Sequence, residues 1–531
     1  MINKRIAYFF WVISFLMIPS LLIAQQLSDS VSNDIDPIYN TTDSSFNKQD
    51  SSLLVLDSTQ IKQESKVIAY LLRKDSLDVY TYSFFRDSVN YIHYQYIDTL
   101  NHLSDQYNPT KYLDVFYNDL GNVGSAQENQ VFSPSTKTGL NIGMNNFNAF
   151  LWLPKDIEVY DIQTPYTDLF YLMGPKKENS LKITHAQSFL KEQLSVNLKF
   201  QLYNSIGFYN HQRNDVKSFY GGMGYRTKNS RYKINAQYYH NKQVLDENGG
   251  IVNLSDFENN AESNRQIIDT KLSTGQNLIR VSGLALEQSF YISKPEPDFS
   301  QISDTNTIKY NGYSVTHFKK PYFDPVSHLG QIRYYFNFER NNLKYTDQEQ
   351  ESSIYDGIPF YPTYDSAIFF DTIGTRKYQN ELIYSNSDYI DDVNHPKFIN
   401  YFFGGRQEYN EYYQDSTKKY FNNYALIGGV FLNISPYLSV LSDAAFYYGD
   451  YLNGDLLFNG KVFLNIKKNY LTGGVQISHR SADWMFQEFS SSRFTWHNSF
   501  DKTDEQKLYV KIERKNILLF AQVRNISNYI F

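Results

Sequence analysis

A side-chain period of two runs through residues 194–240 and limits the chain to strand architectures. From Leu194 the sequence reads LSVNLKFQLY, in which Leu, Val, Leu, Phe and Leu alternate with Ser, Asn, Lys, Gln and Tyr. After the tight connection TKNS, the sequence RYKINAQYYH alternates in the same way. Successive side chains of a strand point to opposite faces, so this period predicts strands with one apolar and one polar face. The apolar face must meet either a protein core or lipid.

The composition argues against two other classes of protein. Among the 531 residues, no apolar run of about 20 residues follows the N-terminus, which excludes a helical membrane bundle. Aromatic residues make up 17% of the chain, too many for a disordered protein. Tyr suits the interfacial girdles of transmembrane barrels, although soluble β-sandwiches and glycan-binding proteins are also rich in Tyr. The formal net charge of −6 gives no reason to expect a nucleic-acid partner.

Residues 1–24 have the features of a secretory signal peptide. Lys4 and Arg5 precede an apolar stretch that ends in a small-residue cleavage box at Ala24. An uncleaved membrane anchor is the alternative, and Pro19 together with Ala24 favours cleavage. The chain contains no Cys, so neither a lipoprotein anchor nor a disulfide framework is available.

Three further regions follow the signal peptide. Residues 25–65 are rich in Ser, Asp, Asn and Thr and predict a disordered segment. Within them NDIDPIYNTTD lacks the ligand spacing of a calcium loop, so a solvated linker is the better interpretation. Residues 66–110 hold short apolar and aromatic runs and are expected to form a small periplasmic or lumen-plugging element. Residues 111–531 are predicted to form one β-barrel.

Strand-like runs recur through this last region, and no segment has a helical stripe over three turns. In hydrocarbon every backbone N–H and C=O must be paired internally, so a sheet spans a membrane only when it closes on itself. We therefore predict an all-β fold, a transmembrane antiparallel up-and-down β-barrel of about 14–18 strands. The main runs cover residues 166–173, 181–187, 194–203, 231–240, 277–293, 329–345, 381–384, 401–406, 422–433, 437–447, 461–467, 471–480, 493–500, 507–513 and 516–525.

The connections between these runs differ widely in length. Those at residues 227–230, 467–470 and 513–516 are hairpin-tight. The connections after His240, Ser293 and Tyr345 are long and polar. Outer-membrane barrels have short periplasmic turns at one rim and long extracellular loops at the other. We expect the same arrangement here.

An ordered set of segments resembles a known family, the putative porin family of Bacteroidetes-type outer membranes. The likeness extends from about residue 112 to the end of the chain, and it implies an outer-membrane β-barrel of a Gram-negative cell without catalytic residues or a defined substrate. The segments are YNDLGNVGSA, TPYTDLFYLMG, LKITHAQSF, NSIGFYNHQRND, RYKINAQYYHNK and ENGGI. Members of the family continue beyond a segment like VRNISNYIF. Phe531 is accordingly either a native barrel terminus or a truncation that leaves the barrel incomplete.

Motifs for catalysis or cofactor binding do not stand out. No Walker, zinc-protease or hydrolase signature occurs, and GGMG (221–224) lies in a strand pattern with no helix after it. His185 with a strand Ser would suit a barrel hydrolase, but a polar-face His is the better interpretation. We expect no enzyme activity, no catalytic residue, no cofactor and no metal.

If the barrel forms, its polar face lines a lumen. A Lys or Arg on the lipid face costs about 2–4 kcal/mol near the midplane, and the alternation avoids that cost. The set of candidates leans basic, which is compatible with a weak anion preference, but scattered charge without a constriction is the better interpretation. The pore-lining candidates are Lys199, Arg231, Lys233, Arg333, Glu339, Lys461 and Lys511.

The leading functional prediction is passive diffusion of small hydrophilic solutes through a monomeric or homo-oligomeric barrel. Its partners would be outer-membrane lipid and the barrel-assembly machinery. One alternative is a non-transport barrel with a structural, adhesion or secretion-associated role, whose lumen is blocked by residues 66–106 or by the long loops. Another is a soluble glycan-binding β protein whose apolar faces pack against each other.

Overall fold

The computed structural model describes most of residues 117–530 and two short strands before them. The chain divides into two compact units, and unit Met1–Lys74, with the expected signal peptide and polar segment, lies outside the described residues. The description below concerns unit Asp75–Phe531. The described residues are 79–83, 94–96, 117–132, 139–140, 145–153, 156–162, 165–190, 193–260, 262–293, 305–310, 313–318, 329–348, 353–355, 369–386, 398–414, 417–435, 437–466, 469–514 and 517–530.

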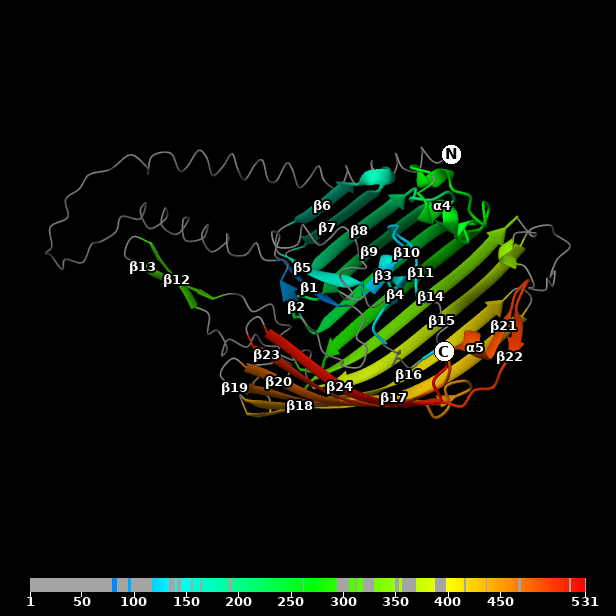
Figure 1. Ribbon diagram of the computed structural model, residues 1–531. Coiled ribbons are helices and arrows are strands. Elements are labelled where there is room, and N and C mark those ends of the chain that lie inside the picture. The colour runs from blue at the N-terminus through cyan, green and yellow to red at the C-terminus, as the bar shows by residue number, and fades with distance from the viewer. Residues whose placement is uncertain are drawn as a thin grey trace, which may run out of the picture. The chain divides into compact units, whose positions relative to one another are not determined.

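Fifteen antiparallel strands form one sheet, which we call the wall. Each wall strand pairs with the next one along the chain, so the wall is a meander, and Figure 1 shows it strongly curved. The strands are β6 (Tyr166–Met173), β7 (Asn179–Phe189), β8 (Leu194–Ser205), β9 (Asn214–Arg226), β10 (Tyr232–Asp246), β11 (Gln276–Tyr291), β14 (Gln331–Asp347), β15 (Phe369–Ser385), β16 (Ile399–Gln414), β17 (Thr417–Ser435), β18 (Leu438–Gly449), β19 (Leu456–Ile466), β20 (Asn469–Arg480), β23 (Thr503–Arg514) and β24 (Ile517–Ser527). This architecture confirms the predicted all-β, up-and-down barrel fold.

The two outermost strands of the wall are β6 and β24. Among the described residues, β6 pairs with β7 alone and β24 with β23 alone. A free strand edge exposes a row of N–H and C=O groups that hydrocarbon cannot satisfy. Both edges therefore need a pairing partner in a membrane.

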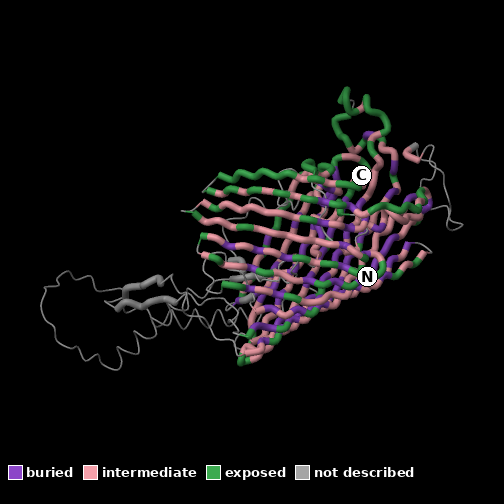
Figure 2. Tube along the Cα trace, turned by 90° about the horizontal axis from the view of Figure 1, so that it is seen from below, coloured by how far each residue is buried: buried purple, intermediate pink, exposed green. Residues whose placement is uncertain are grey.

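The wall has its polarity inverted relative to a soluble sheet. On β11, Leu284 and Phe290 are 43% and 46% exposed, whereas Glu287 and Ser289 on the opposite face are 2% and 4% exposed. A similar alternation runs along β10 and the first half of β14, and Figure 2 shows buried residues interleaved with more exposed ones along the strands of the sheet. Soluble proteins bury apolar side chains and expose charged ones, so an exposed apolar face of this extent indicates contact with lipid.

Two rows of aromatic rings cross the outer face of the wall. Tyr384 and Phe403 form one row, with ring centroids 5.4 Å apart, opposite Ile332. Phe338 and Tyr378 belong to the other, with centroids 5.0 Å apart. Ile332 and Phe338 lie six residues apart on β14, which corresponds to about 20 Å along a strand. Aromatic residues at two levels of an apolar face are typical of the girdles of outer-membrane barrels.

The predicted division of the connections between the two rims is wrong in one place. Consecutive antiparallel strands place alternate connections at the same rim, so the connections after β10 and after β14 share a rim. The long connection after β11, which carries the hairpin of β12 (Thr305–Tyr310) and β13 (Tyr313–Phe318), lies at the opposite rim. That rim also holds the tight turns after β9, β17, β19 and β23.

The expected strand over residues 493–500 is confirmed only as a short strand of three residues, which lies outside the wall. The connection between β20 and β23 contains α5 (Trp484–Gln487) and a hairpin of β21 (Glu488–Ser490) with β22 (Thr495–His497). Phe489 and Trp496 stack at 4.4 Å, and the Trp496 Nε1–H donates to the Met485 carbonyl. The segment packs on the wall rather than joining it: Ser492 donates to the Asp371 carboxylate of β15, and Trp484 contacts the ring of Phe421 of β17.

The region before β6 does not join the wall, although residues 111–531 were predicted to form the barrel as a whole. β5 (Glu158–Ile162) pairs with β1 (Val79–Ser83), which also pairs with β2 (Tyr94–Tyr96). The remaining short elements are β3 (Tyr117–Asp119), β4 (Gln127–Asn129), α4 (Leu254–Glu258) and the 3-10 turns η2 (Asn148–Phe150), η4 (Pro175–Lys177), η5 (Arg265–Ile267) and η7 (Ser353–Tyr355). In the described part of the chain, every helix is too short or too polar to cross a membrane.

Charge on the outer face should destabilise the protein in lipid. Leu284→Arg places a guanidinium in the apolar band. We expect the free energy of unfolding in phospholipid vesicles to fall by about 2–4 kcal/mol. Gln476→Arg, on the inner face of β20, removes one hydrogen bond to Asn459 and should cost less than about 1.5 kcal/mol. Denaturant titration in vesicles measures both, and equal costs would contradict the assignment of the two faces.

Candidate functional site: the filled inner face

The described residues between 117 and 162, which we call the inner segment, lie against the polar face of the wall. Side-chain amides of the wall hold the backbone of this segment. The Asn241 amide receives a hydrogen bond from the Trp152 N–H at 2.9 Å and donates to the Trp152 carbonyl at 2.7 Å. A single side chain therefore replaces the two partners that a strand neighbour would supply.

Four more wall amides repeat this contact on β8, β9 and β10. They donate to backbone carbonyls, so each acceptor is independent of the side chain that the inner segment carries. Asn241 and these four residues form what we call the amide clamp. The pairs are Gln201 with Phe150 at 2.8 Å, Gln243 with Gly124 at 2.6 Å, Asn197 with Glu158 at 3.2 Å and Asn214 with Val123 at 3.2 Å.

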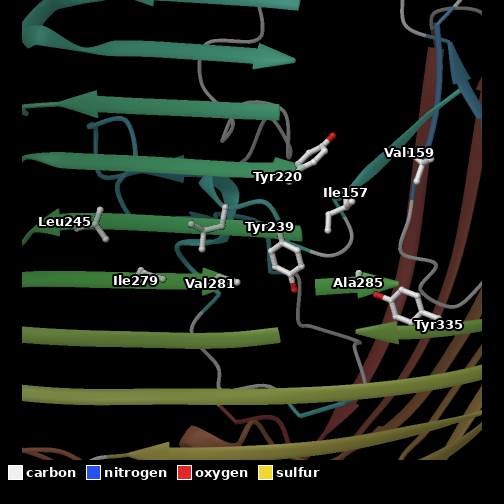
Figure 3. Packing of buried hydrophobic residues seen from close by; sticks show 10 residues of the cluster. Ile157, Val159, Tyr220, Tyr239, Leu245, Ile279, Val281, Ala285 and Tyr335 are labelled. Carbon is white, nitrogen blue, oxygen red and sulfur yellow. The ribbon is translucent and has the colours of Figure 1, made fainter. Parts of the chain in front are cut away.

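An apolar cluster fills the space between the inner segment and the wall. Ile157 and Val159 of the inner segment are fully or almost fully buried and belong to one cluster with Tyr220, Tyr239 and Ala285. Figure 3 shows Ile157 beside the rings of Tyr220 and Tyr239. The polar face of the wall therefore carries rings where the inner segment covers it, and these rings anchor the segment by burial of apolar surface.

Lys199 also serves the inner segment. Its Nζ lies 3.1 Å from a carboxylate oxygen of Glu158 and within 6 Å of the rings of Trp152 and Tyr220. The Tyr160 hydroxyl donates to the same carboxylate at 3.0 Å. Burial is the main cause that raises the pKa of Tyr160, so its hydroxyl keeps its proton and remains a donor. This contact neutralises Lys199 rather than presenting it to a pore.

A buried ladder of charges crosses the neighbouring strands β14, β15 and β16. Glu381 accepts from Arg333 at 3.2 Å and from Arg406 at 2.8 Å. Glu408 continues the ladder to Lys377 at 3.4 Å. Arg333, Glu381 and Glu408 are at most 4% exposed, so the ladder is held together by matched charges in a site of low dielectric.

The structure places six of the seven pore-lining candidates on the polar face by register, and Arg231 lies just before β10; the seven occur in three different settings. Lys199 pairs with Glu158, and Arg333 pairs with Glu381. Glu339 accepts a hydrogen bond from the Tyr239 hydroxyl. Arg231 lies at a rim and donates to the carbonyls of Tyr291 and Ile292, and Lys233 follows it two residues later. Lys461 and Lys511 lie on β19 and β23 and are half-buried, outside the hydrogen-bonded contacts of the inner segment described above.

The amide clamp is the part of the site that the sequence did not identify. The clamp residues do occupy polar positions of alternating strands, so a row of Asn and Gln on three consecutive strands was a visible signal. Their partners lie tens of residues earlier and are backbone atoms, so no sequence pattern identifies them. The GGMG glycines serve the same packing: a Cβ on Gly222 would collide with the Gln237 amide. In the described residues, no group of three or more His, Asp or Glu could hold a metal ion.

Loss of one clamp should loosen the inner segment without unfolding the wall. Asn241→Ala leaves the N–H and C=O of Trp152 without partners, which costs about 2 kcal/mol. We expect amide exchange across residues 145–153 to rise about 30-fold. Asn465→Ala removes an inner-face amide of β19 away from the segment. Hydrogen exchange followed by mass spectrometry separates the two, and unchanged exchange in the Asn241 variant would rule out the clamp.

Breaking the charge ladder should be far more costly than breaking a surface pair. Glu381→Gln leaves Arg333 and Arg406 buried without their shared carboxylate, and we expect a loss of about 3–5 kcal/mol. Glu411→Gln breaks the more exposed ion pair of Glu411 with Arg376. Loss of that pair should cost about 0–1 kcal/mol. Unfolding free energies from denaturant titration report both changes. Similar losses in the two variants would show that the ladder is solvated.

Comparison with known proteins supports this structure. A family model described as "Putative porin" matches residues 78–531. No curated protein matches the chain. Among solved structures, a copper transporter, OprC, is 9% identical with a TM-score of 0.51, over 80% of this chain and 71% of that one. A mutant of the ferric enterobactin receptor PfeA from Pseudomonas aeruginosa is 8% identical with a TM-score of 0.41, over 68% and 52%.

These comparisons differ in what they show. The chain spans about half the length of PfeA, 52%, and the likeness to OprC concerns the fold alone. The family match covers most of the chain, including the wall and the inner segment. The chain belongs to the putative porin family of outer-membrane β-barrels.

Proposed function

We propose that the protein lets small hydrophilic solutes diffuse across the outer membrane through its polar interior. The observation that carries this proposal is the inverted polarity of the wall, with Leu284 exposed and Glu287 buried on the same strand. A polar lumen lowers the cost of moving a hydrated solute past the hydrocarbon, and the interior of porins is polar for this reason. Family membership supports the same function.

The path that we propose lies beside the inner segment, along β18 to β23. There the inner face carries hydrogen-bonded polar side chains: the Gln476 amide donates to Asn459 at 2.9 Å, and Asn459 donates to Asp443 at 2.9 Å. Positions on β19 and β20 are mostly half-buried, whereas the clamp residues on β8 to β10 are covered. A row of amides that exchange partners with water suits neutral and charged small solutes alike.

The ion preference should arise on this uncovered part of the inner face. Lys461 lies there, and we propose that it gives the lumen a weak anion preference, whereas the Nζ of Lys511 is paired with Glu513 at 2.6 Å. Lys199 and Arg333 do not contribute in this account, because Glu158 and Glu381 neutralise them.

We also propose the remaining sequence-based assignments as part of this function. The protein is exported by its N-terminal signal peptide, is inserted by the barrel-assembly machinery and catalyses no reaction. The rim with the tight turns after β17, β19 and β23 faces the periplasm, because outer-membrane barrels place their short turns there.

A barrel without transport is the second candidate, and the amide clamp favours it. The inner segment is held at five backbone positions and by buried apolar packing. If it fills the lumen, the protein has a structural, adhesion or secretion-associated role. The two candidates differ in whether the clamped chain conducts ions.

Conductance in planar bilayers separates them. We expect stepwise conductance from the full chain, and a higher conductance when Gln201→Ala and Asn241→Ala together release the inner segment. The control pair Asn342→Ala and Gln506→Ala removes two amides from the outer face and should leave the conductance nearly unchanged. Conductance only after release would favour the blocked barrel, and none in either form would contradict the proposed function.

The charge on the uncovered inner face should set the reversal potential. Under a salt gradient, Lys461→Glu with Lys511→Glu should shift the reversal potential toward cations, because four units of charge change in the proposed path. The control pair Lys217→Glu and Lys344→Glu alters the same charge on the outer face near a rim. An unchanged reversal potential in the first pair would remove β19 and β23 from the path.

A further inference from the structure

A cavity of about 190 Å³ lies between the inner segment and the wall strands β11, β14, β15 and β16. It is separate from the five clamp contacts and has one apolar and one polar side. The apolar side includes Phe147, Leu151, Ile279 and Leu343, and the polar side includes Asn341 and Asn410. Pockets that bind small molecules combine these two kinds of surface, with a few polar groups that fix orientation.

Two amide groups of this cavity are buried without a hydrogen-bond partner among the described residues. They are the Asn410 Nδ2 donor and the Asn341 Oδ1 acceptor. Asn410 as a whole is 1% exposed. A buried polar group without a partner is costly and rare in folded proteins, so a donor and an acceptor left open in one cavity point to a ligand that supplies both.

The charged groups of the cavity already have hydrogen-bond or ion-pair partners within the protein. A Glu339 carboxylate oxygen accepts from the Tyr239 hydroxyl at 3.0 Å, and the other accepts from the Asn341 amide at 2.9 Å. Lys377 Nζ lies 3.4 Å from Glu408. The open hydrogen-bonding capacity is therefore neutral, which disfavours an ionic ligand.

A hydroxyl group both donates and accepts, and it can meet the Asn341 oxygen and the Asn410 amide in turn. The ring of Phe147 and the side chains of Ile279 and Leu343 would face the C–H surface of such a ligand. A compact molecule with hydroxyls along its edge and C–H groups on its face is a saccharide ring.

We propose that this cavity is a binding site for one neutral saccharide unit among the solutes that pass through the lumen. The inference rests on the proposed function and names its solute class. The site lies between wall and inner segment, so that a bound ring also contacts both.

Binding of glucose to the full chain tests the proposal. The protein is held in dodecylphosphocholine micelles, which carry no sugar headgroup, and saturation-transfer NMR is recorded with D-glucose and, separately, with glycine. We expect transfer to glucose and none to glycine. Asn410→Asp keeps the shape of the side chain but replaces the open donor by an acceptor, and should weaken glucose binding about tenfold.

Matched variants make each outcome decisive. Asn465→Asp is the same change on the inner face of β19 and should leave glucose binding unaltered; an equal loss there would place the binding elsewhere. If Asn410→Asp does not fold, as judged by heat-modifiable gel migration, Asn341→Ala tests the same cavity, because it removes the open Oδ1 acceptor. Transfer to glycine in place of glucose would overturn the ligand class, and transfer to neither would leave a water-filled cavity and overturn the site.

The experiment also separates this inference from the proposed function. Glucose binding in micelles needs no transport, so binding without conductance in bilayers would contradict the pore and keep the site. Conductance without glucose binding would contradict the site and keep the pore.

Discussion

The backbone of a membrane-spanning sheet has to satisfy its own hydrogen bonds, and the rest of this structure follows from that constraint. Hydrocarbon supplies no donor or acceptor, so an unpaired N–H or C=O costs several kcal/mol. Within the described residues, the wall meets this demand for the strands between its two edges, β6 and β24, by an antiparallel meander. Because the backbone is paired, the two faces differ only in their side chains. Apolar residues lie on the outer face, and amides and charged groups lie on the inner face.

An inner face of amides creates a second problem, because buried polar groups also need partners. The protein solves it where the inner segment lies: Asn241 and the other clamp residues pair with backbone atoms of that segment. On β14 to β16, charged side chains of the wall pair with one another, as in the ladder around Glu381. In the cavity beside Asn410, one donor and one acceptor have neither kind of partner among the described residues. We therefore propose a ligand site there.

The period of two was sufficient to predict the fold and the facing of side chains along most wall strands. It located most wall strands and placed candidates such as Lys199 and Lys461 on the polar face, because facing depends only on parity along a strand. The period could not distinguish a strand of the wall from a strand of the inner segment. The sequence EVYDI, which forms β5, resembles a barrel strand. β5 nevertheless pairs with β1 and lies against the polar face of the wall.

Long-range partners account for what the sequence could not predict. Glu158 neutralises Lys199 from about forty residues away, so a residue that looked like a pore charge is an anchor. The rims were misjudged for a related reason: loop length alone does not reveal at which end of the strand a connection lies. Counting strands from β10 to β14 does, and it moves the connection after β11 to the other rim.

The chain contains no Cys, so single cysteines can be introduced along β11 and spin-labelled one at a time in lipid vesicles. Accessibility to oxygen, which dissolves in hydrocarbon, should rise and fall with a period of two. It should be high at Leu284 and Leu286 and low at Ala285 and Glu287. Equal accessibility at adjacent positions, or a maximum at the polar ones, would contradict the central claim that the apolar face of this sheet meets lipid and the polar face meets the inner segment.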